Sequence, residues 1–183
     1  QISSVYDYEE LVAADERSID EFIREYAPSK AELEYLLSPR DFHNAKALVK
    51  AVYLNLDAEK LLAPDGLYPA GKILECIREN ALQPLNPHLR QAIADAAELF
   101  AKGDASGAEI GLIFEKAQFA HLSAVCSKNL LLKKLIAVKA DMTNILTALR
   151  SDGSDYAKRC FVSGGRLAEN RLMQLFGEDK KRV

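Results

Sequence analysis

The chain has 183 residues, which is enough for one domain or two small ones with a real hydrophobic core. It contains 26 Leu and 26 Ala but only 8 Val and 2 Thr, a composition that favours helices and leaves little β-branched material for strands. Its 24 basic and 27 acidic residues nearly balance, which argues against nucleic acid or a membrane surface as a direct partner.

Three helix-start signals lie in the first quarter of the chain. Ser18–Glu21 and Ser29–Glu32 both fit a capping box, in which a hydroxyl accepts from a backbone N–H and the Glu side chain reaches back. Ser38-Pro39 predicts a third start, because Pro is favoured at the first helical position and disfavours helical geometry in the residue before it. We expect this third helix to end near Leu54.

Two loops divide the middle of the chain. Residues 64–66 read Pro-Asp-Gly, a turn signal, and residues 84–87 make a second break, so a short helix is expected near 71–80. Apolar residues at steps of three and four predict a helix from about 87 to 102. Ser106 then opens the next helix through another capping box.

The longest predicted helix spans roughly residues 129–150. Its apolar residues repeat at steps of 4, 3, 4, 3 and 4, and they are Leu131, Leu135, Val138, Met142, Ile145 and Leu149. We expect this seam to lie in the core rather than to bind a partner as a coiled coil. Residues 151–155 read as a loop, and a final amphipathic run follows over 167–176. No segment predicts a strand, so the expected fold is all-α.

A short polar pattern occurs twice, 100 residues apart. Both copies read Asp-x-x-Asn, then apolar residues, then a base. The residues concerned are Asp41, Asn44 and Lys50 in the first copy and Asp141, Asn144 and Arg150 in the second. This recurrence predicts internally repeated helical bundle subdomains.

A glycine segment follows each copy of the pattern. The stretch 68–73 resembles 162–167, which pairs Gly71 with Gly165, and Gly164 precedes the latter.

Positions i and i+3 share a helix face, so the Asp and the Asn of each copy flank the apolar seam. We interpret them as a structural polar network that docks a neighbouring helix or loop, rather than as a catalytic or binding pair, because buried polar groups are normally satisfied internally. No catalytic residue is therefore assigned.

These motifs resemble those of one known family. Asp41 to Leu48 resembles the "D-aromatic-H-N-x-K-x-L" segment of the C subunit of vacuolar and archaeal-type rotary ATPases, called d in eukaryotic enzymes. Residues 114–119 resemble its "D-x-x-Y/F" helix, 131–150 its "L-x-x-h-x-x-h-x-x-D-h-T-N-h-x-x-x-L-R" helix, and 164–167 its following glycine segment. The set spans about residues 38–176 in the family's order, although Glu115 or Lys116 stands in the region where the family often has Asp.

The resemblance implies a funnel of three related helical subdomains, of which this chain would cover about the middle half. Residues 1–67 would then be the C-terminal part of one subdomain, 68–161 a second, and 162–183 the start of a third. The implied function is that of a non-catalytic, central-axis subunit without cofactors, on the cytoplasmic, peripheral side of the membrane. Its partners would be the central-stalk subunits and the membrane rotor ring, and its role would be torque transmission for proton or sodium transport. A chain lacking neighbouring subdomains would expose apolar surface, so we expect it to self-associate.

Other chemistry finds little support in the sequence. The three His residues lack metal-binding spacing, the three Cys residues form no CxxC pair, and no phosphate-binding glycine motif is present. No apolar run reaches the ~20 residues needed to span a bilayer, and the first residues do not resemble a signal peptide. The composition also allows a generic helical scaffold or adaptor of another family. An enzyme using Asp41 and His43 as acid and base is the least favoured alternative.

Overall fold

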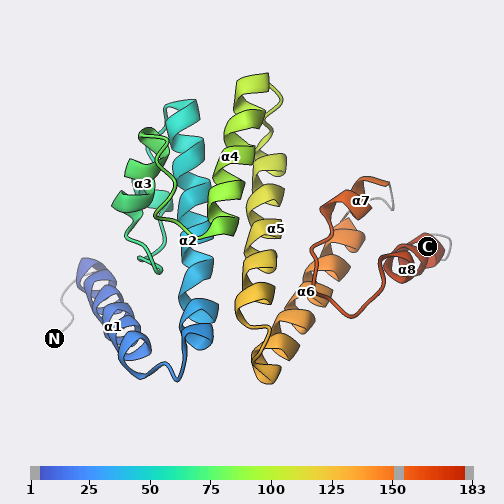
Figure 1. Ribbon diagram of the computed structural model, residues 1–183, viewed down its shortest axis with the longest axis horizontal. Coiled ribbons are helices and arrows are strands. Elements are labelled where there is room, and N and C mark those ends of the chain that lie inside the picture. Colours follow the sequence, from blue (N-terminus) through green and yellow to red (C-terminus); the bar gives the residue numbers. More distant parts are fainter. Residues whose placement is uncertain (1–4, 151–154, 180–183) are drawn as a thin grey trace.

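The computed structural model describes residues 5–150 and 155–179, and in these ranges the chain forms helices and loops without a strand (Figure 1). The all-α prediction is confirmed. The helices are α1 (Val5–Tyr26), α2 (Lys30–Leu54), η1 (a 3-10 turn, Glu59–Leu61), α3 (Ala70–Arg78), α4 (Pro87–Lys102), α5 (Gly107–Val125), α6 (Leu130–Arg150), α7 (Asp155–Cys160) and α8 (Glu169–Asp179). Helix α1 lies at one end of the molecule and α6, α7 and α8 lie at the other.

Helix α2 is longer than the sequence predicts. Ser29 caps it as expected, since its Oγ accepts from the backbone N–H of Ala31 at 3.1 Å. The helix then continues to Leu54 with Pro39 inside it, so the predicted helix start at Ser38-Pro39 is wrong. Proline removes one helical hydrogen bond, but the side chains of Leu37 and Phe42 on either side of it are buried in the fold. Tertiary packing therefore outweighs the local cost.

The helix start predicted at Ser18 is also wrong, because α1 already runs through this residue from Val5. A hydroxyl caps the N-terminus of a helix only where the chain enters the helix from a non-helical conformation. The Leu, Ala and Glu residues before Ser18 are good helix formers, so the chain is already helical there. Ser18 is simply an exposed position on α1.

The remaining predicted helices are confirmed, with ends shifted by a few residues at most. Helix α3 corresponds to the short helix expected near 71–80, and α4 ends at Lys102 with Gly103 as its C-cap, whose φ of 77° suits glycine. Ser106 caps α5 by accepting from the N–H of Glu109 at 3.1 Å. Of the loop predicted at 151–155, residues 151–154 lie outside the described ranges, and Asp155 begins α7, which was not predicted.

Among the described residues, three apolar clusters hold helices α2 to α8 together. The first and largest joins α2, α3, α4 and α5, and its buried members include Phe42, Val49, Ile73, Leu89, Ile93 and Phe114. The second joins the end of α5 to α6 and includes Phe119, Leu122, Cys126, Leu132 and Ile136. The third joins α6, α7 and α8 through Ala148, Ala157, Phe161 and Leu172. Helix α5 contributes to both of the first two clusters and therefore links them.

Most of the apolar seam of α6 lies outside these cores. Five of its six residues are exposed, and they are Leu131, Leu135, Val138, Met142 and Leu149. The expectation that this seam is buried is therefore wrong. Helix α6 has a second face, which carries Leu132, Ile136 and Ala140, and the small alanine lets this face pack closely against α5. We refer to the exposed seam as the outer face of α6.

Candidate functional site

The first Asp–Asn pair binds the loop that follows α2. Both carboxylate oxygens of Asp41 accept backbone hydrogen bonds at 3.1 Å, from the N–H groups of Leu67 and Tyr68. One turn later, Asn44 bonds both polar groups of Ala63: its Oδ1 accepts from the N–H at 2.8 Å and its Nδ2 donates to the carbonyl at 3.1 Å. Both side chains are fully buried. We call this arrangement the first Asp–Asn site.

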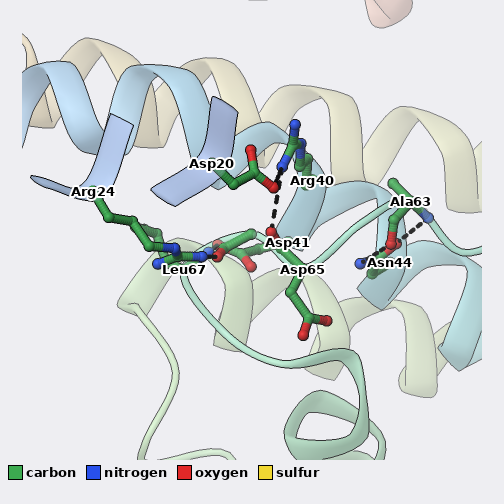
Figure 2. A network of polar contacts seen from close by, with 9 residues as sticks. Asp20, Arg24, Arg40, Asp41, Asn44, Ala63, Asp65 and Leu67 are labelled. Atoms are coloured by element: carbon green, nitrogen blue, oxygen red, sulfur yellow. Dashed lines mark hydrogen bonds and ion pairs between the residues drawn. The ribbon is translucent and has the colours of Figure 1, made fainter. Parts of the chain in front are cut away.

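Charged residues surround this site, as Figure 2 shows. Arg40, which precedes Asp41 on α2, pairs with Asp20 of α1 at 2.5 Å and reaches the carbonyl of Asp65 at 3.5 Å. Arg24 of α1 donates to the carbonyl of Gly66. The loop over 63–68 is therefore bound from α2 on one side and from α1 on the other.

The second Asp–Asn site repeats this geometry on α6. The Oδ1 atom of Asp141 accepts from the N–H groups of Arg166 at 2.7 Å and Leu167 at 2.9 Å. Asn144 bonds both polar groups of Val162, at 2.8 Å for the N–H and 2.9 Å for the carbonyl. Asp141 and Asn144 are likewise buried. The two sites thus bind loop residues at equivalent positions, although the loops share almost no sequence.

Glycine beneath each carboxylate allows the loop to approach. A Cβ on Gly165 would overlap Oδ1 of Asp141, and a Cβ on Gly66 would overlap Oδ1 of Asp41 and lie 2.7 Å from the carbonyl oxygen of Leu37. Gly71 does not take this position: it lies in the first turn of α3, where a Cβ would meet nothing within 4 Å. The pairing of Gly71 with Gly165 is therefore corrected to Gly66 with Gly165. The sequence comparison paired the two glycines because a basic residue comes after each of them. The fold instead requires a residue without a side chain next to the Asp carboxylate.

The other residues of the repeated pattern differ between its copies. Lys50 donates from Nζ to the carbonyl of Gly107 at 3.2 Å, which ties α2 to the first residue of α5. Arg150, its counterpart at the end of α6, is exposed and lines a pocket between α2 and α5. Gly164 has a φ of 98°, a left-handed conformation that favours glycine, and precedes the backbone that Asp141 binds.

Burial sets the protonation of Asp41. Removal from water raises the pKa of this carboxyl to about 7, against the opposing effect of the two backbone N–H groups and of Arg24. Near neutral pH the carboxyl group of Asp41 is therefore only partly ionised.

With this geometry described, comparison with known proteins identifies the family. A protein-family model described as ATP synthase (C/AC39) subunit matches residues 3–182. The chain belongs to this family. No curated protein and no solved structure gives a significant match. Both Asp–Asn sites of this C/AC39 chain lie within the matched range, as do all the described helices.

The described part of the C/AC39 chain has a pocket with a volume of about 1030 Å³. It lies between α2 and α5, and the end of α6 closes one side, with His43, Lys46, Glu115 and Arg150 among its lining residues. Asp41 does not line this pocket, because its carboxylate faces the 63–68 loop. His43 is exposed, and its Nε2 lies 2.9 Å from the carbonyl oxygen of Leu61. Asp41 and His43 are therefore not brought together as an acid and base pair.

The sequence analysis did not predict a second cluster of polar side chains. Glu34 of α2 and His121 of α5 are both buried, with 2.7 Å between Oε2 and Nε2, and Lys30 pairs with Glu34 from the solvent side at 3.2 Å. The ring of His88 meets that of His121 edge-on at 5.7 Å. Burial lowers the pKa of His121, and His88 lowers it further, while Glu34 acts in the opposite direction. No sequence signal links residues so far apart in the chain.

Two further findings concern the described ranges. No three His, Cys, Asp or Glu side chains in them are grouped so that they could hold a metal ion. None of their helices is both long enough and apolar enough to cross a membrane.

Proposed function

We propose that this chain is a non-catalytic, central-axis subunit of a vacuolar/archaeal-type ATPase that couples the central stalk to the membrane rotor ring. The observation that carries the proposal is the family match over residues 3–182. In this role the chain transmits torque for proton or sodium transport and performs no hydrolysis itself. It lies on the cytoplasmic, peripheral side of the membrane and reaches the membrane only through the complex.

The two Asp–Asn sites support this role mechanically. A subunit that passes torque must resist bending, and close-packed helices are poorly compressible. Loops are normally the weak points of a helical body, because they lack repeated backbone hydrogen bonds. Here each loop is bonded four times by two buried side chains of the preceding helix. We propose that this unit, helix plus bonded loop, is the repeated element of the coupling body.

Affinity purification tests the assignment. The chain, tagged at its chromosomal locus, is isolated in a mild detergent that keeps rotary ATPases intact, and the attached proteins are identified by mass spectrometry. We expect central-stalk and rotor-ring subunits in comparable amounts. Recovery of neither would overturn the proposal and would favour a scaffold or adaptor of another assembly.

A functional measurement separates coupling from catalysis. In membrane vesicles, the Asn144→Ala variant removes both bonds to Val162. We expect less ion uptake for each ATP hydrolysed, because the loosened loop lets the body yield under torque. The matched control is Gln91→Ala, an exposed side chain that bonds only Asp95 on its own helix and should leave the ratio unchanged. An unchanged ratio in Asn144→Ala would contradict the mechanical role of the site.

A further inference from the structure

The first turn of α2 is bound to the corner between α5 and α6. The carboxylate of Glu32 accepts a hydrogen bond from Nδ2 of Asn129 at 2.5 Å, and Oδ1 of the same Asn129 accepts from the N–H of Leu132 at the start of α6. The thiol of Cys126, the C-cap of α5, donates to the carbonyl of Ala31 at 3.7 Å. We call these contacts the joint, because they connect the helix of the first Asp–Asn site to the helix of the second (Figure 1).

The centre of the joint is closed to solvent. Ala31 and Tyr35 of α2 pack against the second apolar cluster, in which Phe119, Leu122 and Cys126 are buried. Cys126 is 0% exposed. A reagent in solution therefore reaches this thiol only when the joint opens.

An ionisable pair lies beside the joint, between the same two helices. Glu34 follows Glu32 on α2, His121 precedes Cys126 by five residues on α5, and both side chains of the pair are buried. Oε2 of Glu34 and Nε2 of His121 are 2.7 Å apart, but they are not aligned for a hydrogen bond. The contact is therefore mainly electrostatic, and its strength depends on which of the two groups is charged.

The surroundings of His121 oppose a positive charge on its ring. Lys30 pairs with Glu34 at 3.2 Å and offsets part of the carboxylate charge, His88 of α4 meets the ring edge-on at 5.7 Å, and the apolar ring of Phe42 lies at 5.6 Å. Burial lowers the pKa of His121 by more than Glu34 raises it, and His88 and Lys30 lower this pKa further. The closed joint therefore favours the neutral imidazole.

A pocket gives water access to this ring. It has a volume of about 440 Å³, and Glu34, Tyr68, His88 and His121 are among its lining residues. The pKa of Tyr68 is raised, mainly by burial, so this phenol stays uncharged in weak acid. A protonated imidazole that moves toward the pocket can thus be hydrated, which it cannot be in the closed joint.

We propose that the joint is a pH-sensitive switch, in which a proton on His121 loosens the hold of α2 on the corner between α5 and α6. With a neutral ring the pair stays buried and the joint is closed. A charged ring draws water into the pocket, and α5 separates from the first turn of α2. The angle between the two Asp–Asn sites is then fixed less tightly in acid. This inference does not rest on the ATPase assignment.

The size of the effect follows from linkage. In the open joint His121 titrates near its ordinary pKa of about 6.5, whereas the closed joint resists the proton. The stabilisation of the closed joint is therefore complete above about pH 6.5 and is lost as the pH falls below it. Between about pH 7.5 and 5.5 the open fraction should rise about tenfold. Asp41 acts on stability in the opposite direction, but it lies outside the joint and is present in every variant below.

Thiol labelling of the full chain measures the opening. The reagent is 4,4′-dithiodipyridine, which also reacts in weak acid, and mass spectrometry of acid-digested peptides separates Cys126 from Cys76 and Cys160. The labelling rate of the folded chain is divided by that of the urea-unfolded chain at the same pH, which removes the titration of the thiol itself. We expect this ratio for Cys126 to rise about tenfold from about pH 7.5 to 5.5. An unchanged ratio would overturn the proposal.

Variants identify the group that takes the proton. His121→Gln cannot be charged and should give a ratio that does not change with pH. Glu34→Gln and His88→Gln should keep the rise, as should the control His43→Gln, which replaces an exposed histidine away from the joint. A rise that persists in His121→Gln, or that disappears in the Glu34 or His88 variant, would overturn the proposal.

A second measurement needs no variant and so does not depend on the folding of His121→Gln. The ring signals of the three histidines are followed by NMR during a pH titration of the wild-type chain. We expect the midpoint of His121 to lie below its ordinary value of about 6.5. A midpoint above that value would mean that the closed joint binds the proton more tightly than the open one, which would overturn the proposal.

Discussion

Gly66→Ala is the most direct test of the first Asp–Asn site. The added Cβ would overlap Oδ1 of Asp41 and lie 2.7 Å from the carbonyl oxygen of Leu37. A backbone carbonyl inside a helix cannot swing aside as a long side chain can, so the loop itself must retreat. Retreat breaks the bonds from Leu67 and Tyr68 to the carboxylate.

The expected cost follows from those two bonds. A hydrogen bond to a charged group contributes about 1.5–3 kcal/mol, and the buried acceptor is left without a partner when it is lost. The pKa of Asp41 is about 7, so the carboxyl is only partly charged at neutral pH and the lower figure applies. We expect a loss of about 3 kcal/mol in unfolding free energy for the two bonds together. With a urea m-value of about 2 kcal/mol/M, the unfolding midpoint falls by about 1.5 M.

The assay is urea unfolding followed by circular dichroism at 222 nm, at a protein concentration low enough to keep the chain monomeric. Gly71→Ala is the matched control, since a Cβ there meets nothing and alanine favours the first turn of α3. It should unfold at the same urea concentration as the wild type or slightly higher. The reasoning is refuted if the Gly66 and Gly71 variants unfold together. Gly165→Ala should lie between them, because its Cβ would overlap Oδ1 of Asp141 but its nearest backbone atom, the nitrogen of Asp141, lies 3.4 Å away.

Three further predictions concern single side chains. Asn144→Ala leaves both polar groups of Val162 without their bonds, so unfolding free energy should fall by about 2–3 kcal/mol in the same assay. Ser106→Ala removes the cap of α5 and should cost about 1 kcal/mol, with Ser106→Asp retaining most of it. The raised pKa of Asp41 means that the folded chain holds a proton that the unfolded chain releases near pH 4, so stability should fall as pH rises from about 4 to about 7, by at most about 1.4 kcal/mol per pH unit. Asp41→Asn should lose this component of the pH dependence.

Each of these has a contradicting result. An Asn144→Ala variant as stable as the wild type would mean that water or another group replaces the lost bonds. A Ser106→Ala variant as stable as the wild type would show that the cap hydroxyl contributes nothing. If wild type and Asp41→Asn share the same stability profile between pH 4 and 7, the carboxyl does not titrate in that window.

Some features of this protein follow from the sequence alone. The excess of Leu and Ala over β-branched residues determines the all-α class, and the caps at Ser29 and Ser106 determine where α2 and α5 begin. The recurring Asp-x-x-Asn pattern marked Asp41, Asn44, Asp141 and Asn144 as residues of interest before their partners were known. These signals depend on residues within one or two helical turns of each other, so they can be recognised in a short segment of sequence without knowledge of its neighbours in the fold.

Other features were decided only by tertiary structure. Pro39 lies inside α2 because buried neighbours outweigh a lost hydrogen bond, and Gly66 rather than Gly71 meets Asp41 because the loop folds back over the helix. The pairing of Glu34 with His121 joins α2 to α5 and leaves no mark in either local sequence. Helix α6 has two apolar faces, and which one is buried depends on the surfaces that α5 and the 162–167 loop present to it. Burial is a property of neighbours distant in the chain, and periodicity along one helix cannot encode it.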